Sequence, residues 1–235
     1  GTMKHIPEPE QDLRSICISP SGKYIATASI LGHIFDPIRI WSVKTGQKIM
    51  ELKASVTEVC GYLADTVSSQ FYTIEPYGGR LKKWDLNSGE GLVWTSNHKV
   101  DGIGKSLCLS KKRDKVVLVV RKTMEIYATE TGELIQEIYD EEYGQGAEIK
   151  SVFFWPNDKF LLTGHSNGKV KLWSIETGER VAQQETEIEI LNISPISDNK
   201  VIVSGTSDYY VKTMAGVQFD SSQNVFKEAI RPEQY

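Results

Sequence analysis

A segment of about 43 residues repeats along the chain, and this period limits the fold more than any other feature of the sequence. Each repeat contains a strand-like run with a large marker residue near its end, followed by a polar turn that closes on glycine. Successive markers lie 43, 43, 46 and 41 residues apart, and they are Trp41, Trp84, Tyr127, Trp173 and Met214. A regular spacing of this size indicates a repeat architecture.

Each repeat is predicted to form four short strands. In the fourth repeat they are residues 149–154, 159–163, 170–175 and 180–184. No stretch has a sustained 3.6-residue apolar period, so the chain is predicted to be all-β. A four-stranded antiparallel sheet cannot bury both of its faces alone, and stacked sheets can. The sequence therefore predicts a β-propeller of four-stranded blades.

The predicted propeller spans residues 13–220. Residues 1–12 form an N-terminal segment, in which residues 3–7 are a weak candidate for the closing outer strand. Residues 217–220 are the candidate fourth strand of the fifth repeat, residues 221–235 are a C-terminal tail, and residues 31–37 are an enlarged loop in the first repeat.

The runs Leu-Leu-Thr-Gly-His-Ser-Asn-Gly-Lys-Val-Lys-Leu-Trp at 161–173 and Val-Ile-Val-Ser-Gly-Thr-Ser-Asp at 201–208 resemble the WD-repeat β-propeller family. Blades of that family often hold a buried network of Asp, His, Ser or Thr, and Trp. The family's Asp position, six residues before the marker, holds Asp208 and Asn167 in the last two repeats, but Gly78 and Arg121 in the second and third. The resemblance therefore implies degenerate blades, held by packing more than by the polar network.

Members of that family most often have seven blades, and five repeats are visible here. Two readings follow from this difference. The chain could close as a five-bladed ring, or it could be an open or truncated propeller whose missing blade comes from a partner chain or an absent region. An open end would expose strand edges to which another chain can add.

Composition points to an ordinary globular protein, with 40% hydrophobic and 25% charged residues. No apolar run reaches the roughly 18 residues of a membrane helix, and no signal-peptide core is present at the N-terminus. An intracellular protein without membrane contact is expected, in the cytoplasm or nucleus. The net charge of −4 gives no general reason to expect nucleic acid. Cys17, Cys60 and Cys108 lie in strand-like runs and are expected to be small buried side chains.

Catalytic motifs are absent from the sequence. The four histidines fall in different repeats without ligand spacing, and there is no nucleophile elbow, phosphate loop or dinucleotide fingerprint. A propeller enzyme with a central metal would need several carboxylates or histidines at the starts of inner strands, where this chain has mostly apolar or neutral residues. We therefore expect no enzyme, no metal and no cofactor.

Binding residues are expected in the loops that join second to third strands and in the loop between the third and fourth repeats, which together would form a top face. Aromatic and arginine side chains are enriched at interfaces. The expected contact residues are Phe35, Tyr77, Arg80, Arg121, Lys122, Glu141, Glu142, Tyr143, His165 and Tyr209, where the acidic loop at 140–146 would suit a basic peptide. For each residue alone, a neutral or solvated role is the alternative, and for His165 that alternative includes a structural role.

A basic turn forms a second candidate surface, expected on the opposite face. It contains Lys111, Lys112, Arg113 and Lys115, and it could bind an acidic protein or RNA or be simply solvated. Trp41, Trp84 and Trp173 are expected in the blade cores, and Trp155 is expected to be partly exposed. The sequence thus predicts a non-enzymatic scaffold or adaptor, a subunit of an intracellular multiprotein complex whose partner is a protein, peptide or domain. An RNA- or chromatin-associated propeller is the alternative.

Overall fold

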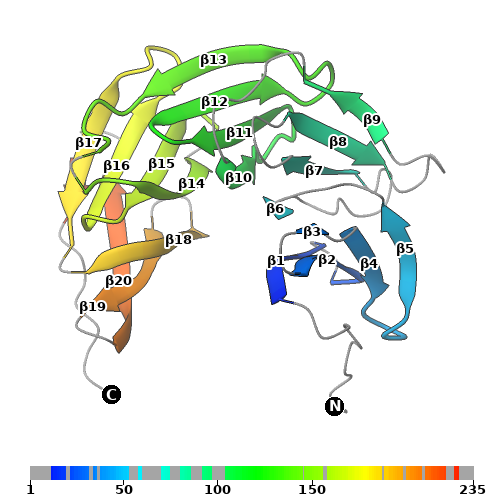
Figure 1. The fold of residues 1–235 in the computed structure, drawn as a ribbon. Helices are drawn as coiled ribbons and strands as arrows, with labels where there is room; N and C mark the ends of the chain where they lie inside the picture. Colours follow the sequence, from blue (N-terminus) through cyan, green and yellow to red (C-terminus); the bar gives the residue numbers. More distant parts are fainter. Residues whose placement is uncertain are drawn as a thin grey trace. The chain divides into compact units, whose positions relative to one another are not determined.

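All regular elements in the described part of the chain are β-strands. A computed structural model describes residues 12–19, 22–31, 34–35, 38–52, 58–59, 70–74, 80–85, 92–96, 104–144, 146–155, 158–186, 188–197, 200–207, 210–220 and 225–227. The strands form five antiparallel sheets of propeller-blade type (Figure 1). The sheets belong to two compact units, residues 1–104 with 129–133 (unit 1) and residues 105–128 with 134–235 (unit 2).

Unit 1 contains the first two sheets. The first has the order β1-β2-β4-β5, with β3 paired to the end of β2, and the second has the order β6-β7-β8-β9. The strands are β1 (Asp12–Ile18), β2 (Tyr24–Leu31), β3 (Ile34–Phe35), β4 (Ile38–Ser42), β5 (Lys48–Leu52), β6 (Glu58–Val59), β7 (Gln70–Ile74), β8 (Leu81–Asp85) and β9 (Leu92–Thr95). The predicted loop at 31–37 therefore includes a short strand, because Ile34 and Phe35 pair with Leu31 and Ile30.

Unit 2 contains the third, fourth and fifth sheets, each with its four strands paired in chain order. The strands are β10 (Gly104–Leu109), β11 (Lys115–Val120), β12 (Thr123–Ala128), β13 (Leu134–Tyr139), β14 (Ile149–Trp155), β15 (Phe160–His165), β16 (Lys169–Ser174), β17 (Arg180–Glu185), β18 (Glu189–Ser197), β19 (Lys200–Ser207), β20 (Tyr210–Asp220) and β21 (Val225–Lys227).

The end of the fifth sheet differs from the prediction. Residues 217–220 are not a separate fourth strand, because Val217 and Gln218 pair with Val201 and Lys200 and so extend β20. The fourth strand is β21, which lies in the predicted tail and pairs with residues 218–220. The candidate closing strand at residues 3–7 lies outside the described residues.

The repeat is visible in the backbone of the turns. Gly46, Gly132 and Gly178 follow the third strand of three sheets and have φ angles of 71°, 75° and 74°. Glycine adopts this left-handed conformation at little cost, which explains its recurrence. The turns after Trp41 and Trp173 also share their hydrogen bonds, since Gly46 N donates to Ser42 O and Gly178 N donates to Ser174 O.

The marker tryptophans are core residues, as predicted. Trp41, Trp84 and Trp173 are 4%, 5% and 4% exposed. Each indole Nε1 donates to a threonine of the neighbouring strand: Thr27 at 2.9 Å, Thr73 at 2.8 Å and Thr163 at 2.9 Å. Polar contacts therefore persist in these blades beside packing, more than the degenerate sequence indicates.

The third sheet replaces this pair with another. Leu118 stands at the threonine position and cannot accept a hydrogen bond. The marker is Tyr127, whose hydroxyl donates instead to the buried carboxylate of Glu125. Glu125 lies opposite Leu118 in the register of β11 and β12. Glu125 thus gives the buried Tyr127 hydroxyl a hydrogen-bond partner, which buried polar groups generally have.

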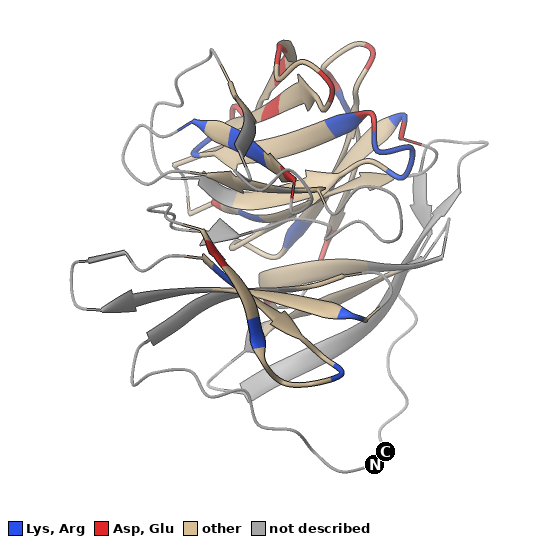
Figure 2. Cartoon of the chain, turned by 90° about the vertical axis from the view of Figure 1, so that its right-hand side faces the viewer, with Lys and Arg blue, Asp and Glu red and all other residues tan. Residues whose placement is uncertain are grey.

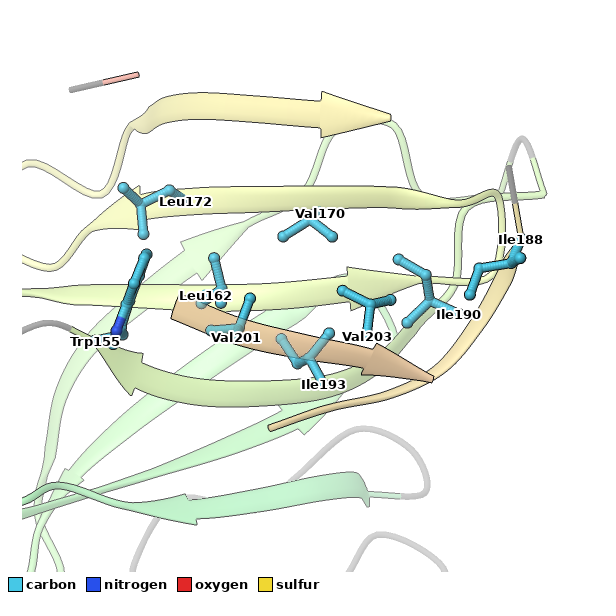
Figure 3. Close-up of a cluster of buried hydrophobic side chains, with 9 residues drawn as sticks. All are labelled: Trp155, Leu162, Val170, Leu172, Ile188, Ile190, Ile193, Val201 and Val203. Carbon is cyan, nitrogen blue, oxygen red and sulfur yellow. The ribbon is translucent and has the colours of Figure 1, made fainter. Parts of the chain in front are cut away.

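Aliphatic clusters fill the spaces between the sheets of unit 2. The cluster between the fourth and fifth sheets is shown in Figure 3 and includes Leu162, Val170, Ile193 and Val203. Trp155 belongs to it and is only 4% exposed, so the prediction of a partly exposed Trp155 is wrong. It ends β14, and its ring lies near Leu172 at the edge of the cluster.

A second cluster joins the third and fourth sheets. It includes Val117, Met124, Val152 and Trp173, and Cys108 packs against it half-buried. Burial raises the pKa of the Cys108 thiol to about 11, so it is a protonated packing side chain near neutral pH. This agrees with the predicted role. The side chains of Cys17 and Cys60 lie outside the described residues.

Candidate protein-interaction surface

Several predicted contact residues meet at one end of unit 2. The connection from β13 to β14 begins at Asp140, whose backbone N donates to Lys122 O in the β11–β12 turn at 2.8 Å. Further along, Glu148 N donates to Ser166 Oγ, at the start of the β15–β16 turn, at 2.9 Å. We name this end the 140-loop surface. It gathers five of the predicted residues, Arg121, Lys122, Glu141, Glu142 and Tyr143.

Side chains of the 140-loop surface differ in exposure. Arg121, Lys122 and Glu141 are exposed, whereas Glu142 and Tyr143 are half-buried. The loop folds on itself, since Tyr143 N donates to Asp140 O at 3.2 Å and Glu142 N donates to Asp140 Oδ1 at 3.1 Å. These two hydrogen bonds hold the loop backbone in one conformation. The side chains of the loop therefore keep defined positions, which lowers the entropy cost of binding a partner.

Glu142 is neutralised within the protein. Its carboxylate accepts from Lys169 Nζ at 3.0 Å and from the Arg180 guanidinium, and it lies 3.1 Å from Lys171 Nζ. The hydrogen bond from Arg180, followed by that from Lys169, lowers the pKa of Glu142 to about 2. The acidic loop is therefore less available to a basic peptide than predicted, because its 142 carboxylate already has three basic partners.

Glu142→Gln should change how stability depends on acid. Glu142 has a depressed pKa in the folded protein, so its contribution is present above the unfolded pKa of about 4.3 and is lost as the pH falls toward 2. We expect the urea midpoint of the natural chain to fall between about pH 4.3 and 2 more steeply than that of Glu142→Gln. At pH 7 the natural chain should be the more stable of the two, by a modest amount because the Glu142 and Arg180 side chains are partly exposed. Glu179→Gln is the control, and parallel midpoint curves for Glu142→Gln and the natural chain would contradict the expectation.

Beneath the loop lies a buried ion pair. Lys171 Nζ donates to both carboxylate oxygens of Asp140, at 2.8 and 2.9 Å, and these side chains are 0% and 1% exposed. Lys171 belongs to β16 of the fourth sheet, while Asp140 follows the last strand of the third. The pair therefore ties the 140-loop to the next sheet. Both contacts come from one ammonium nitrogen and are charge-assisted, which makes them stronger than hydrogen bonds between neutral groups.

His165 extends this network to the tryptophan of the fourth sheet. Its Nε2 lies 2.7 Å from Thr163 Oγ1, the same hydroxyl that accepts from Trp173, and its Nδ1 lies 3.4 Å from Asp140 Oδ2. Burial, with Lys171 nearby, lowers the pKa of His165 to about 4. The imidazole is thus neutral near pH 7. Trp173, Thr163, His165, Asp140 and Lys171 form one chain of polar contacts.

His165 is fully buried, so its predicted place on an exposed binding surface is wrong. The sequence places it after the second strand, but β15 continues to His165 and turns the ring inward. The family pattern described above places the acid six residues before the marker, whereas here Asp140 precedes the first strand of the fourth sheet and His165 ends the second. The sequence analysis did not identify Asp140 and Lys171 as members of a buried network. The signal that could have identified Asp140 is an acidic residue before the first strand of a repeat that has a histidine after its second strand.

The other predicted top-face residues are Phe35, Tyr77, Arg80 and Tyr209. Arg80 is exposed immediately before β8 in unit 1. Phe35 is in β3, but its side chain, like Tyr77 and Tyr209, lies outside the described residues. Their role in binding stays a prediction.

The basic turn between β10 and β11 is held by an acidic side chain. The Asp158 carboxylate accepts from the backbone N of Lys111 and of Lys112, both at 2.8 Å. Lys115 Nζ lies 2.7 Å from Asp114 Oδ2. Lys111, Lys112 and Arg113 have exposed side chains, while Lys115 is half-buried. Two carboxylates therefore offset part of the positive charge, and charges of both signs lie close together in several described turns (Figure 2).

Side chains able to bind a metal ion are dispersed. Among the described residues no three His, Cys, Asp or Glu side chains are grouped as ligands for such an ion. Within the same residues no helix has the length and apolar character needed to cross a membrane.

Comparison with known proteins identifies the repeat type. Residues 106–195 match the family model described as the WD40 domain of anaphase-promoting complex subunit 4. This part of the chain is therefore similar to WD40 repeats. A designed protein of known crystal structure, Ika8, superimposes on 93% of this chain and 61% of its own with a TM-score of 0.65 at 17% identity, which is a likeness of fold.

The curated relatives of this chain include subunits of a translation factor. It is 27% identical over 183 residues to eukaryotic translation initiation factor 3 subunit I of Drosophila willistoni and 26% identical to that of Drosophila melanogaster. The match covers 73% of this chain and 55% or 54% of the two relatives. The chain thus spans about half the length of these relatives. Both names describe subunits of a larger assembly, and neither describes an enzyme.

Proposed function

We propose that this WD-repeat chain is a non-enzymatic scaffold, a subunit of an intracellular multiprotein complex that acts in the cytoplasm. The observation that carries the proposal is the similarity over 73% of the chain to a protein named as a subunit of a multisubunit factor. The repeated sheets support it, because they give a wide surface built on packed cores without needing a reactive residue. Fold alone would not suffice, since propellers host many functions.

The 140-loop surface is the proposed contact site on this scaffold. It combines exposed charges of both signs, Arg121, Lys122 and Glu141, with the aromatic ring of Tyr143. Aromatic and arginine side chains are enriched at interface centres, and polar side chains are typical of the surrounding rim. Because the buried network fixes the loop from below, we propose that a protein partner docks on it with little rearrangement.

Affinity purification from the native extract tests both statements. The tagged chain should retain partners in constant stoichiometry, measured by quantitative mass spectrometry. Lys122→Glu and Tyr143→Ala should each reduce their recovery at least about fivefold, as loss of an interface residue worth about 1 kcal/mol or more implies. Glu179→Ala, an exposed change outside this surface, is the matched control.

Recovery of no stoichiometric partner by the natural chain would reject the scaffold. Full recovery with Lys122→Glu and Tyr143→Ala would reject the 140-loop surface and leave the scaffold in place. Circular dichroism of each variant confirms that the fold is retained.

RNA binding through the basic turn is the alternative function. Its support is the exposure of Lys111, Lys112 and Arg113 on a turn that Asp158 holds in place. Binding of a labelled single-stranded RNA should then weaken steeply between about 50 and 200 mM salt, because phosphate contacts release counterions. A triple change of these residues to Ser should abolish it. Equal binding by the natural and triple-variant chains would reject this alternative.

A further inference from the structure

The carboxylate of Glu142 lies among three cations that come from one pair of strands. Its Oε2 is 3.0 Å from Lys169 Nζ and 3.1 Å from Lys171 Nζ, and its Oε1 accepts from the Arg180 guanidinium. Lys169 and Lys171 belong to β16 and Arg180 to β17, which pair in the fourth sheet. We name these three side chains the β16–β17 cation cluster. Both oxygens of a single carboxylate therefore have cationic partners.

The β16–β17 cation cluster is also held by contacts that do not involve Glu142. Each cation has a second partner, and these contacts are Lys171 with both oxygens of Asp140, Arg180 with Gln183 Oε1 at 2.9 Å and Lys169 with Glu185 at 4.0 Å. The cluster should therefore keep its arrangement when the Glu142 side chain moves away. A site that is organised before its ligand arrives loses less free energy on binding.

The charge of the cluster is balanced only while Glu142 is in place. The three cations face three carboxylates, those of Asp140, Glu142 and Glu185. Asp140 is buried beneath the loop, whereas the Glu142 side chain is 33% exposed and the Arg180 side chain 40% exposed. Departure of the Glu142 carboxylate would thus leave one unmatched positive charge in a position that solvent, and therefore another chain, can reach.

The β11–β12 turn adds further positive charge to the 140-loop surface. Arg121 and Lys122 are exposed, and Lys122 O accepts from Asp140 N, which joins this turn to the loop. Glu141 is an exposed acidic residue of the same loop. A segment with several carboxylates could contact both the cluster and the turn, whereas a basic segment would be repelled by both. Complementary charge therefore favours an acidic partner segment.

We propose that the β16–β17 cation cluster binds a carboxylate of an acidic protein segment, which takes the place of Glu142, so that Glu142 is an internal competitor of the partner. The inference rests on the proposed function, because it states which chemistry the 140-loop surface recognises. An Asp or Glu side chain presents two oxygens, as the Glu142 carboxylate does now. Only molecules whose Glu142 has moved away can bind, so the internal contact lowers the apparent affinity for the partner.

A gain of binding by Glu142→Gln tests this directly. The probe is fluorescein-labelled hexaglutamate, followed by fluorescence anisotropy near neutral pH at about 50 mM salt, where charge contacts are weakly screened. Glu142→Gln should bind it at least about fivefold more tightly than the natural chain does. Adding Arg180→Gln to Glu142→Gln should cancel the gain. Glu148→Gln is the matched control, because it removes the same charge from a partly exposed contact with Lys150 on this surface, and it should change binding less than about twofold.

Other outcomes would overturn the proposal. Equal or weaker binding of hexaglutamate by Glu142→Gln would show that Glu142 does not compete, and an equal gain in Glu148→Gln would reduce the effect to net charge. A labelled hexanucleotide RNA that gains as much as hexaglutamate would assign the cluster to phosphate.

The two proposals fail in different ways. If the natural chain retains stoichiometric partners and Glu142→Gln retains them no better, the scaffold stands and this inference falls. If no stoichiometric partner is recovered but hexaglutamate shows the gain, the scaffold falls and the chemistry of the cluster stands. Circular dichroism of each variant confirms that the fold is retained.

Discussion

Asp140→Asn is expected to destabilise unit 2 by about 3 kcal/mol, one of the two largest effects predicted for a single substitution here. The side chain of Asp140 holds the fully buried ammonium of Lys171 at 2.8 and 2.9 Å. Asparagine keeps the shape but removes the charge, which leaves Lys171 desolvated with Glu142 as its remaining acidic neighbour. A buried charge that loses its partner costs far more than an exposed one.

A double-mutant cycle separates the pair from its surroundings. Lys171→Met removes the ammonium and keeps much of the aliphatic stem, so the variant with both changes should be more stable than Asp140→Asn alone. Lys150→Met, which breaks the partly exposed contact of Lys150 with Glu148, is the control and should cost less than about 1 kcal/mol. Urea unfolding at pH 7 supplies the free energies. A cost for Asp140→Asn no greater than that of the control would show that this pair is not desolvated.

Much of the fold could be predicted because each repeat has, at fixed positions, residue types with clear backbone preferences. The markers Trp41 and Trp173 are each the penultimate residue of a strand, and Gly46 and Gly178 supply the left-handed turn that follows. The four strands predicted for the fourth repeat lie within two residues of the observed bounds of β14 to β17. The errors occur where a strand is defined by its pairing with a neighbouring strand and not by its own sequence. One example is β21, whose three residues are too few to show a periodic pattern.

The candidate site was predicted less well, because its chemistry depends on which side chains meet. Asp140, His165 and Lys171 are 25 and 6 residues apart in sequence and come from a loop and two strands. An acidic loop with an embedded tyrosine reads as free negative charge, yet the structure places Lys169, Lys171 and Arg180 against Glu142. The exposure of Arg121 and Lys122 could be predicted, because a polar two-residue turn that joins two buried strands must lie at the surface.

Thr163→Val is expected to cost about 3 kcal/mol, and more than the same change at Thr73. The Thr163 hydroxyl serves Trp173 Nε1 at 2.9 Å and His165 Nε2 at 2.7 Å, both buried, whereas the Thr73 hydroxyl serves Trp84 Nε1 at 2.8 Å. Valine has nearly the same shape and removes the hydrogen bonds that the threonine hydroxyl makes. Every unsatisfied buried group costs about 1–3 kcal/mol, so two orphaned groups should cost more than one.

Because His165 also lies close to Asp140, the loss of the Thr163 hydroxyl should destabilise the loop of the 140-loop surface. Hydrogen exchange of residues 140–144 should become faster in Thr163→Val and stay unchanged in Thr73→Val, while Thr163→Ser, which keeps the hydroxyl, should preserve protection.

The pH dependence of stability provides an independent readout. A buried neutral histidine with a folded pKa of about 4 makes stability fall as the pH drops from about 6.5 toward 4, because the unfolded chain binds the extra proton. His165→Gln should flatten that slope, and an unchanged slope would mean that the imidazole is not desolvated within the network that supports the loop.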